Sequence, residues 1–242
     1  MENHFDEDVA ERYDESTVEM FDPTVVGSVV DFIAEQARRG AALEFGVGTG
    51  RIAIPLAAKG VPLTGIDLSQ AMIDRLQAKP GGRDIEVVVG DMTSTRATGV
   101  FSVVFLVFNT IMNLTTQSEQ VACLRNAASH LGPGGRFIVE VMVPALRLLP
   151  PGQRHVVFHS DEGEWGIDEY NVVTQGLISH HIEVVDAEVR RHSIPFRYVW
   201  PSELDLMAEM AGMRLRERYA TWSRGQFTHE SRQHVSVWEK LA

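Results

Sequence analysis

The chain has 242 residues, of which 44% are hydrophobic and 23% are charged, a balance typical of a folded globular protein and unlike that of a disordered chain. The formal net charge is −11, and because a negative surface repels phosphate backbones, we expect no nucleic acid partner. One cysteine excludes an internal disulfide, and we recognise neither a signal peptide nor an apolar run long enough to span a bilayer, so we predict a cytoplasmic protein without a membrane partner.

Helical and strand patterns alternate through the first 144 residues. Residues 1–20 are polar, and Phe5, Tyr13 and the adjoining Phe21 could serve as aromatic anchors. Asp22 followed by Pro23 predicts a capped helix start. The alternation predicts a parallel sheet with right-handed crossovers. The predicted helices span residues 23–38, 49–59, 69–78 and 117–131, and the predicted strands span residues 42–45, 62–67, 85–90, 100–108 and 136–143. Cys123 lies among small apolar residues of the last helix, which predicts a packing role.

The rhythm changes after Pro144. From about residue 153 to residue 200 the polarity alternates with period two, which predicts antiparallel strands. Pro201 then opens a helix, for which we predict Ser202 as N-cap, Asp205 at the third helical position and Gly212 as the stop. Residues 214–222 and 234–241 read as two closing strands. We therefore predict one domain formed by residues 1–144 and 201–242, with an antiparallel β insertion at 145–200.

The strongest chemical signal is a glycine-rich loop after the first strand, LEFGVGTG. Gly46, Gly48 and Gly50 stand at alternate positions just before a helix, an arrangement that lets a nucleoside-bearing cofactor lie over a helix N-terminus. The spacing departs from the dinucleotide fingerprint, because Arg51 stands where the third glycine would fall. Glu44 precedes the loop, where a carboxylate would repel a pyrophosphate and attract an ammonium group.

Two further carboxylates follow the next two strands. Asp67, in GIDLS, falls at the end of the second strand beside Leu68, where its oxygens can accept hydrogen bonds from both hydroxyls of a ribose. The alternative role, capping the next helix, is already met by Ser69. Asp91, in GDM, follows the third strand. It could accept a hydrogen bond from an adenine amino group while Met92 packs on the ring, or it could be a turn carboxylate.

The ordered set LEFGVGTG, GIDLS, GDM, VFLVFNT and LGPGGRFIVE resembles the class I S-adenosylmethionine-dependent methyltransferases over residues 41–143. The resemblance implies an α/β fold with a seven-stranded, mostly parallel, doubly wound sheet that residues 201–242 complete with a reversed hairpin. It implies S-adenosylmethionine as cofactor, with Phe108 and Asn109 beside it and Tyr13 closing over its methionine end. The implied cofactor-binding set is Tyr13, Glu44, Gly46, Gly48, Gly50, Arg51, Asp67, Leu68, Asp91, Met92, Phe108 and Asn109.

The implied reaction is in-line displacement at a sulfonium methyl, which needs an oriented acceptor and exclusion of water but neither a covalent intermediate nor a metal. We expect a small organic metabolite methylated at oxygen, nitrogen or carbon. Nucleobase amino methyltransferases usually carry D/N-P-P-Y/F after the fourth strand, whereas this chain has FNTIMN, so that class is disfavoured. Asn113 could orient an acceptor or only structure its loop. The catalytic residues stay unassigned.

The insertion at 145–200 stands where this family commonly places a substrate lid or a dimerising sheet, so we also expect a homodimer through it. Its histidines could include a general base, although each is more readily a strand-face residue, and adjacent His180 and His181 must face opposite sides. The histidines are His155, His159, His180, His181 and His192. The aromatic residues, of which at least half should be core, are Trp165, Tyr170, Phe196, Tyr198 and Trp200. Two other functions stay open, an NAD-dependent oxidoreductase and a non-catalytic protein that binds S-adenosylmethionine.

Overall fold

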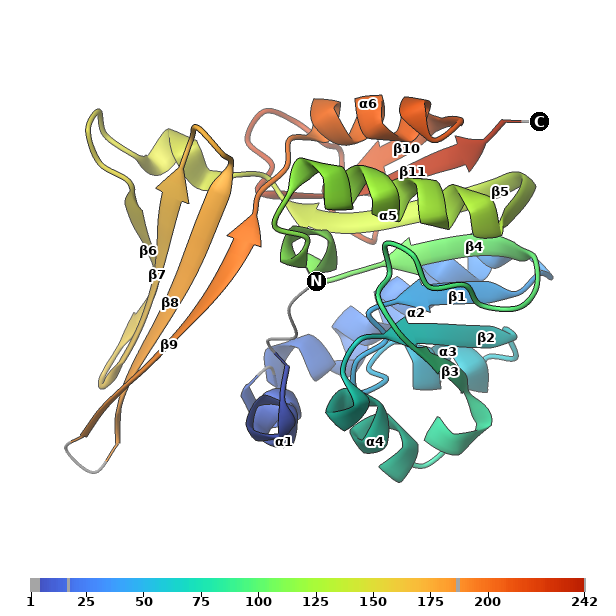
Figure 1. The fold of residues 1–242 in the computed structure, drawn as a ribbon, viewed down its shortest axis with the longest axis horizontal. Helices are drawn as coiled ribbons and strands as arrows, with labels where there is room; N and C mark the ends of the chain where they lie inside the picture. The colour runs from blue at the N-terminus through green and yellow to red at the C-terminus, as the bar shows by residue number, and fades with distance from the viewer. Residues whose placement is uncertain (1–4, 17, 186–187, 242) are drawn as a thin grey trace.

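The protein is described here by a computed structural model that covers residues 5–16, 18–185 and 188–241 (Figure 1). A seven-stranded sheet has the order β10-β11-β5-β4-β1-β2-β3, and a separate four-stranded sheet has the order β6-β7-β8-β9. The helices are α1 (Glu7–Ser16), η1 (Val18–Phe21), α2 (Pro23–Ala37), α3 (Ala53–Ala58), α4 (Gln70–Ala78), η2 (Gly82–Asp84), η3 (Thr110–Asn113), α5 (Gln117–His130), η4 (Ala145–Leu148) and α6 (Pro201–Met210). The strands are β1 (Ala42–Phe45), β2 (Leu63–Asp67), β3 (Glu86–Val89), β4 (Phe101–Leu106), β5 (Leu131–Met142), β6 (His155–Asp161), β7 (Glu164–Asn171), β8 (Gly176–Val185), β9 (Glu188–Arg197), β10 (Met213–Tyr219) and β11 (Gln233–Lys240).

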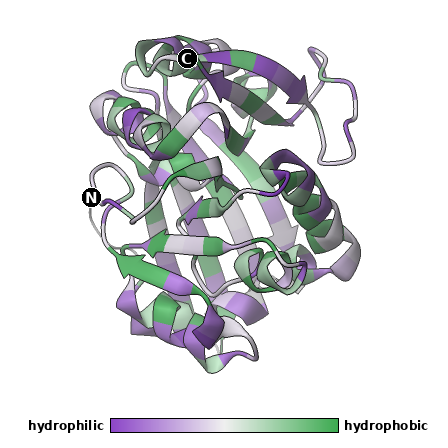
Figure 2. Cartoon of the chain, turned by 90° about the vertical axis from the view of Figure 1, so that its right-hand side faces the viewer, coloured by the Kyte–Doolittle hydropathy of each residue, from purple (hydrophilic) through white to green (hydrophobic). Residues whose placement is uncertain are grey.

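The large sheet confirms the predicted fold class. Strands β3, β2, β1, β4 and β5 run parallel, and β11 enters antiparallel between β5 and β10. Strand β4 is apolar because helices cover both of its sides. Val103 and Phe105 pack with α2, whereas Val104 and Leu106 pack with α5 and α6. Figure 2 shows apolar and polar residues following one another along the helices that flank the sheet. This burial on both faces is typical of a central parallel strand.

Three local predictions were wrong. Helix α3 begins at Ala53, four residues later than predicted, because the preceding loop turns through Gly48 and Gly50 with positive φ. Strand β5 begins at Leu131 directly after α5, five residues earlier than predicted, but its register with β4 shifts between the pairs Phe101–Leu131 and Val103–Arg136, so the glycine-rich segment interrupts the regular pairing where a turn was predicted. Helix α6 begins at Pro201 without a side-chain cap, so Ser202 is not its N-cap.

Asp205 does not take part in capping helix α6. Its side chain contacts residues of the closing hairpin instead. Its carboxylate accepts hydrogen bonds from the Arg218 guanidinium at 2.7 and 3.1 Å and from Trp238 Nε1 at 2.9 Å. It therefore fastens α6 to the closing hairpin, β10 and β11. The other predicted caps are confirmed, since Asp22 Oδ1 accepts from Thr24 N at 2.8 Å and Ser69 Oγ accepts from Met72 N at 3.2 Å.

The four-stranded sheet β6–β9, called the lid sheet below, is antiparallel throughout. It stands beyond the ends of the large sheet's strands, on the side where β5 leaves that sheet, and α1 lies on the same side (Figure 1). The carboxyl ends of parallel strands meet at this edge, which is where doubly wound sheets bind ligands. Within the described residues, no helix is both long and apolar enough to cross a membrane.

Candidate cofactor and acceptor site

The loop between β1 and α3 depends on its glycines. Gly46 has φ +68°, and a Cβ atom there would lie 2.7 Å from Thr110 Cγ2. Gly50 has φ +84°, and a Cβ atom there would lie 2.9 Å from Leu76 Cγ. Side chains are strained at positive φ and have no space at either point. The loop is therefore held close against η3 on one side and α4 on the other.

Asp67 ties the end of β2 to that loop. Its Oδ2 accepts a hydrogen bond from Gly48 N at 2.7 Å, and its Oδ1 accepts one from Ser69 N at 2.9 Å. Burial raises the pKa of Asp67, and the backbone hydrogen bonds oppose that shift. Each carboxylate oxygen has two acceptor positions, so both can still accept a hydrogen bond from a ligand. Asp67 thus orders the glycine loop and keeps acceptor capacity.

Glu44 is a buried acid without a complete set of partners. The residue is 2% exposed, and its Oε2 makes no hydrogen bond within the described part of the chain. Burial raises the pKa of Glu44 well above its usual value, while the charge of Arg51 acts in the opposite direction. An unsatisfied buried carboxylate is costly unless a cation or a hydrogen-bond donor joins it. The position therefore fits a ligand ammonium group.

Arg51 joins two segments around the glycine loop. Its Nη1 donates to the carbonyl oxygen of Met20 at 3.1 Å, and its guanidinium lies 5.3 Å from the centre of the Phe108 ring. A cation over an aromatic face is a favourable contact. Arg51 thereby holds the N-terminal segment and the loop after β4 against the glycine loop.

The loop after β4 is strained and firmly held. Phe108 and Asn109 have φ of 55° and 59°, a region that residues other than glycine rarely adopt. Phe108 N donates to Glu140 Oε2 at 2.9 Å, and Asn109 Oδ1 accepts from Met142 N at 2.7 Å. Trp222 Nε1 donates to Glu140 Oε1 at 2.8 Å. Sequence reasoning missed Glu140 and Trp222, although a lone acid in the apolar run RFIVEVMV was a usable signal.

The N-terminal segment covers the glycine loop. Thr49 Oγ1 donates to Asp14 Oδ1 at 2.6 Å, and Lys79 forms an ion pair with Asp14. Burial raises the pKa of Tyr13; among the charges that act on it, that of Arg51 lowers it and that of Asp67 raises it. The Tyr13 hydroxyl is therefore close to both groups. The structure places Tyr13 on α1, a helix that the sequence did not reveal, above the predicted cofactor loop.

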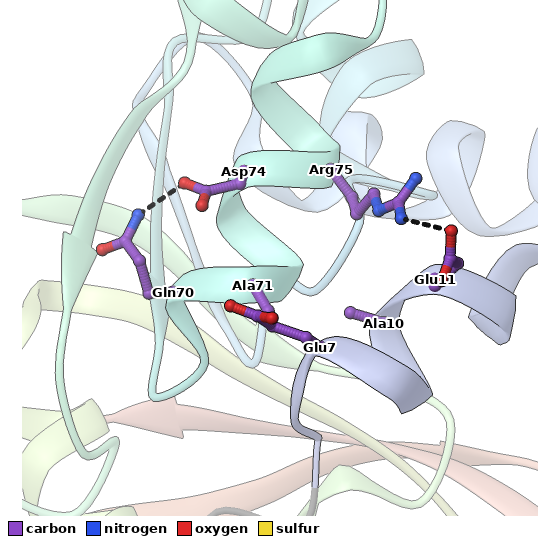
Figure 3. Close-up of a pocket in the computed structure, with 7 residues that line it drawn as sticks. All are labelled: Glu7, Ala10, Glu11, Gln70, Ala71, Asp74 and Arg75. Carbon is purple, nitrogen blue, oxygen red and sulfur yellow. Dashed lines mark hydrogen bonds and ion pairs between the residues drawn. The ribbon is translucent and has the colours of Figure 1, made fainter.

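Helix α1 rests on α4 along a polar groove of about 350 Å³ (Figure 3). Arg75 Nη2 lies 3.5 Å from Glu11 Oε1 across the groove, and Gln70 Nε2 donates to Asp74 Oδ1 at 2.7 Å on α4. The lining residues are Glu7, Ala10, Glu11, Gln70, Ala71, Asp74 and Arg75. None of them belongs to the predicted cofactor set. The groove is the seam where α1 meets α4, beside the site.

The loop after β3 adjoins Asp67. Gly90 N donates to the main-chain oxygen of Asp67 at 2.8 Å, so the two loops lie together. Asp91 Oδ1 accepts from Thr93 N at 2.7 Å, which is a turn contact, and Met92 is buried. Asp91 can make this turn contact and still bind an adenine amino group, because a carboxylate can accept more than one hydrogen bond. Leu68 lies half-buried between Asp67 and Ser69.

The insertion histidines behave as strand-face residues. His180 lies on the face that carries Glu169, with its Nε2 3.3 Å from Glu169 Oε2, whereas His181 lies on the other face, with its Nε2 3.3 Å from Ser179 Oγ. His155 and His159 are exposed. Of the five aromatic residues, Tyr170 and Tyr198 are buried and Phe196 packs against the core, as expected. Cys123 is also buried in that core.

Comparison with known proteins identifies the family of this chain. The family described as "Methyltransferase domain" matches residues 42–135. The chain is 36% identical to the CcbJ methyltransferase from Streptomyces caelestis, and the two structures superpose with a TM-score of 0.86 over 97% of this chain and 96% of that one. The chain belongs to the class I S-adenosylmethionine-dependent methyltransferases. This methyltransferase uses S-adenosylmethionine as its cofactor.

Two more distant comparisons agree. The methyltransferase is 29% identical to the cypemycin N-terminal methyltransferase from a Streptomyces species over 205 residues, which is 82% of each chain. The sugar N-methyltransferase KedS8 from a Streptoalloteichus species shares the fold, with a TM-score of 0.67 and 19% identity over 96% of this chain and 92% of that one. Nothing in these comparisons supports an NAD-dependent oxidoreductase or a protein without catalytic activity.

Proposed function

We propose that this methyltransferase transfers the methyl group to a nitrogen of a small, amine-bearing acceptor. The observation that carries the proposal is the likeness to the cypemycin N-terminal methyltransferase over 82% of both chains, since that relative is named for an N-terminal, and hence nitrogen-bearing, target. The formal net charge of −11 adds support, because a negative protein attracts cationic amines and repels anionic acceptors.

The geometry supports one arrangement of the cofactor. Glu44 would accept hydrogen bonds from the methionine ammonium, because its buried Oε2 has no other partner among the described residues. Asp67 would hold the ribose hydroxyls over the glycine loop that it already orders. Asp91 would bind the adenine amino group with Met92 against the ring, on the loop that adjoins Asp67.

The remaining members of the predicted set surround these carboxylates. Tyr13 would cover the methionine end from α1, and Phe108 and Asn109 would face the cofactor from the loop after β4. Gly46, Gly48, Gly50, Arg51 and Leu68 complete the cofactor-binding set that we propose. The orphaned oxygen of Glu44 and the spare acceptor capacity of Asp67 both fit a ligand that carries an ammonium group and a diol.

When bound, S-adenosylmethionine supplies a methyl group on a sulfonium: the acceptor N–C bond forms as the C–S bond breaks, the sulfur leaves as a neutral thioether, and the product ammonium releases one proton. The protein's part is to orient the acceptor nitrogen in line and to exclude water. The strained loop after β4, held by Glu140, would supply a rigid wall beside the reacting groups. Helix α1 and the lid sheet cover the same edge of the large sheet (Figure 1).

The test is methyl transfer from S-adenosylmethionine to four probes: alaninamide, alanylglycine and glucosamine as amines, and catechol as an oxygen acceptor. We expect turnover of at least one amine, with mass spectrometry and NMR placing the new methyl group on nitrogen. Transfer to catechol alone, or no transfer to any amine by enzyme that binds S-adenosylhomocysteine, would overturn the proposal.

Other sequence predictions stay predictions: a homodimer through residues 145–200, the lack of a nucleic acid partner, and a cytoplasmic location. For the homodimer, the lid sheet presents exposed Val157, Trp165 and Ile178 on the face opposite Tyr170. A second copy could cover these side chains about a two-fold axis. Analytical ultracentrifugation of the wild type and of the Trp165→Ser variant tests this dimer. If the dimer forms through this face, the variant should sediment with a lower mass than the wild type.

A further inference from the structure

One face of the lid sheet, called the inner face, points toward the large sheet. Strand pairing puts Val156, Asp168 and Ser179 side by side on this face, and Tyr170 beside Leu177 in the next row. Tyr170 and Leu177 are buried in the main hydrophobic core, and Val156 packs against it. The same cluster contains Ile111 and Leu114 around η3, and Ala145 and Leu146 pack against it after β5. The inner face therefore meets the carboxyl edge of the large sheet.

Tyr170 brings an unpartnered hydroxyl to this junction. The residue is 3% exposed, and its hydroxyl oxygen is buried without a hydrogen bond among the described residues. Burial raises the pKa of Tyr170 to about 12, and the nearby charge of Asp168 acts in the same direction; the Ala145 amide lies close enough to lower it. The hydroxyl is thus protonated, lies near Asp168, and can both donate and accept a hydrogen bond.

Asp168 follows Tyr170 on the same face, one row further from the core. Burial raises the pKa of Asp168, whereas the Ser179 side chain across the strand pair lowers it. The next residue, Glu169, points to the opposite face, where it pairs with Arg154 and His180. No lysine or arginine forms an ion pair with Asp168 among the residues that the structure describes. Asp168 is the half-buried acid of the inner face, whereas Glu164 and Glu183 on the same face are exposed.

Asn113 adds a third oxygen from the opposite side of the junction. It ends η3, the short helix after β4 that packs against β9. Its Nδ2 donates to the carbonyl oxygen of Thr110 at 3.2 Å, but its Oδ1 is buried and unpartnered within the described chain. Buried polar atoms are normally satisfied. Two such atoms, one on each side of the junction, leave hydrogen-bonding capacity there.

We propose that Asn113, Asp168 and Tyr170 form the acceptor subsite of this enzyme and select an acceptor rich in N–H and O–H donors over an anionic one. This assignment rests on the proposed amine methylation and names the residues that would determine specificity for it. Asp168 attracts the amine in its protonated form, which releases one proton to solvent before the neutral nitrogen can attack, while Tyr170 and Asn113 fix the orientation of its donor groups. The three side chains offer oxygen atoms to a ligand, which suits amines, amides and amino sugars.

Arg197, one of the arginines near the junction, does not offer a competing anion site. Arg197 is buried beside the same elements, but its guanidinium donates to Glu203 Oε1 at 2.8 Å, to Gln120 Oε1 and to Gln175 Oε1. Its charge is therefore neutralised within the protein. An acceptor that carried a carboxylate or phosphate here would be repelled by the Asp168 carboxylate.

The test uses steady-state kinetics with the panel amine that has the highest kcat/KM. Asp168→Asn should raise the KM for that amine about tenfold, as expected when a charged hydrogen-bond partner is lost, with kcat and the S-adenosylhomocysteine Kd changed less than twofold. Glu169→Gln, its neighbour on the other face, should leave all three values unchanged. A structural defect would instead alter kcat or cofactor affinity as well.

Tyr170→Phe is a second variant that tests the subsite if Asp168→Asn fails to fold. It removes only the unpartnered hydroxyl, so the KM should rise about three- to fivefold, as for the loss of one hydrogen bond, while Tm stays level or rises. An unchanged KM in both folded variants would overturn the subsite. If the wild-type enzyme methylates no amine of the panel, the proposed function fails and the subsite with it. Amine turnover with insensitive variants refutes the subsite alone.

Discussion

Replacing Glu44 by glutamine should raise the unfolding free energy of the cofactor-free protein and weaken its affinity for S-adenosylhomocysteine. Glu44 is 2% exposed, its Oε2 is unpartnered, and its pKa is raised well above the usual value by burial. As pH rises from the ordinary value toward the raised one, the unfolded chain has released this proton while the folded chain keeps it. The unfolding free energy therefore falls with pH through this window.

The size of the effect follows from the cost of a buried, unsatisfied group. Removing the charge should raise the unfolding free energy by about 1–3 kcal/mol above the window, a Tm increase of a few degrees for a chain of this length. The same change removes the partner of the methionine ammonium, so S-adenosylhomocysteine should bind about 10- to 100-fold more weakly.

Differential scanning fluorimetry across pH and titration calorimetry measure the two effects. Glu86→Gln is the matched control, since Glu86 is exposed on β3, and both quantities should stay at wild-type values there. The reasoning is refuted if Glu44→Gln lowers Tm at neutral pH and leaves S-adenosylhomocysteine affinity unchanged, because the carboxylate would then stabilise the protein rather than the ligand.

Three other substitutions test other parts of the account. Gly46→Ala should lower the unfolding free energy by about 1–3 kcal/mol in urea denaturation, because a Cβ at positive φ would strike Thr110; an unchanged midpoint would contradict the loop geometry. Asn109→Ala leaves Met142 N without its 2.7 Å acceptor, so kcat/KM should fall about tenfold or more in the methyl-transfer assay; full activity would count against a positioned loop. His234 is buried and its pKa is lowered to about 3 by desolvation, so its contribution to the unfolding free energy should fall as pH drops below about 6.5, by roughly 1 kcal/mol per pH unit. His234→Asn should reduce the dependence of the unfolding free energy on pH, as measured by urea denaturation. The same pH dependence in the variant and the wild type would refute this role of His234.

The sequence predicted the fold through features that are local. The glycine loop, the acids at strand ends and the apolar strands all follow from neighbours in the chain, and Asp22 and Ser69 cap their helices as expected. The order of motifs then indicated the seven-stranded topology. Asp67 and Glu44 were found because each stands at the carboxyl end of a strand, where parallel sheets place their ligands.

The features that sequence reasoning missed depend on contacts between distant segments. Helix α1 gains its stability from contacts such as that of Asp14 with Thr49, so its own polar sequence gave no clear pattern. Ser202 has the side chain of an N-cap, but Pro201 already opens the helix. Glu140 read as one polar residue in a strand because its partners, Phe108 N and Trp222, are far away in the chain.

The central claim is that carboxylates on successive loops at one edge of the sheet bind S-adenosylmethionine. Titration calorimetry of S-adenosylhomocysteine with wild type, Asp67→Ala and the exposed control Asp74→Ala tests it most directly. We predict that Asp67→Ala loses about 1.5–3 kcal/mol of binding free energy, roughly 10- to 150-fold in Kd, while Asp74→Ala matches wild type. Wild-type affinity in a folded Asp67→Ala variant would contradict the claim.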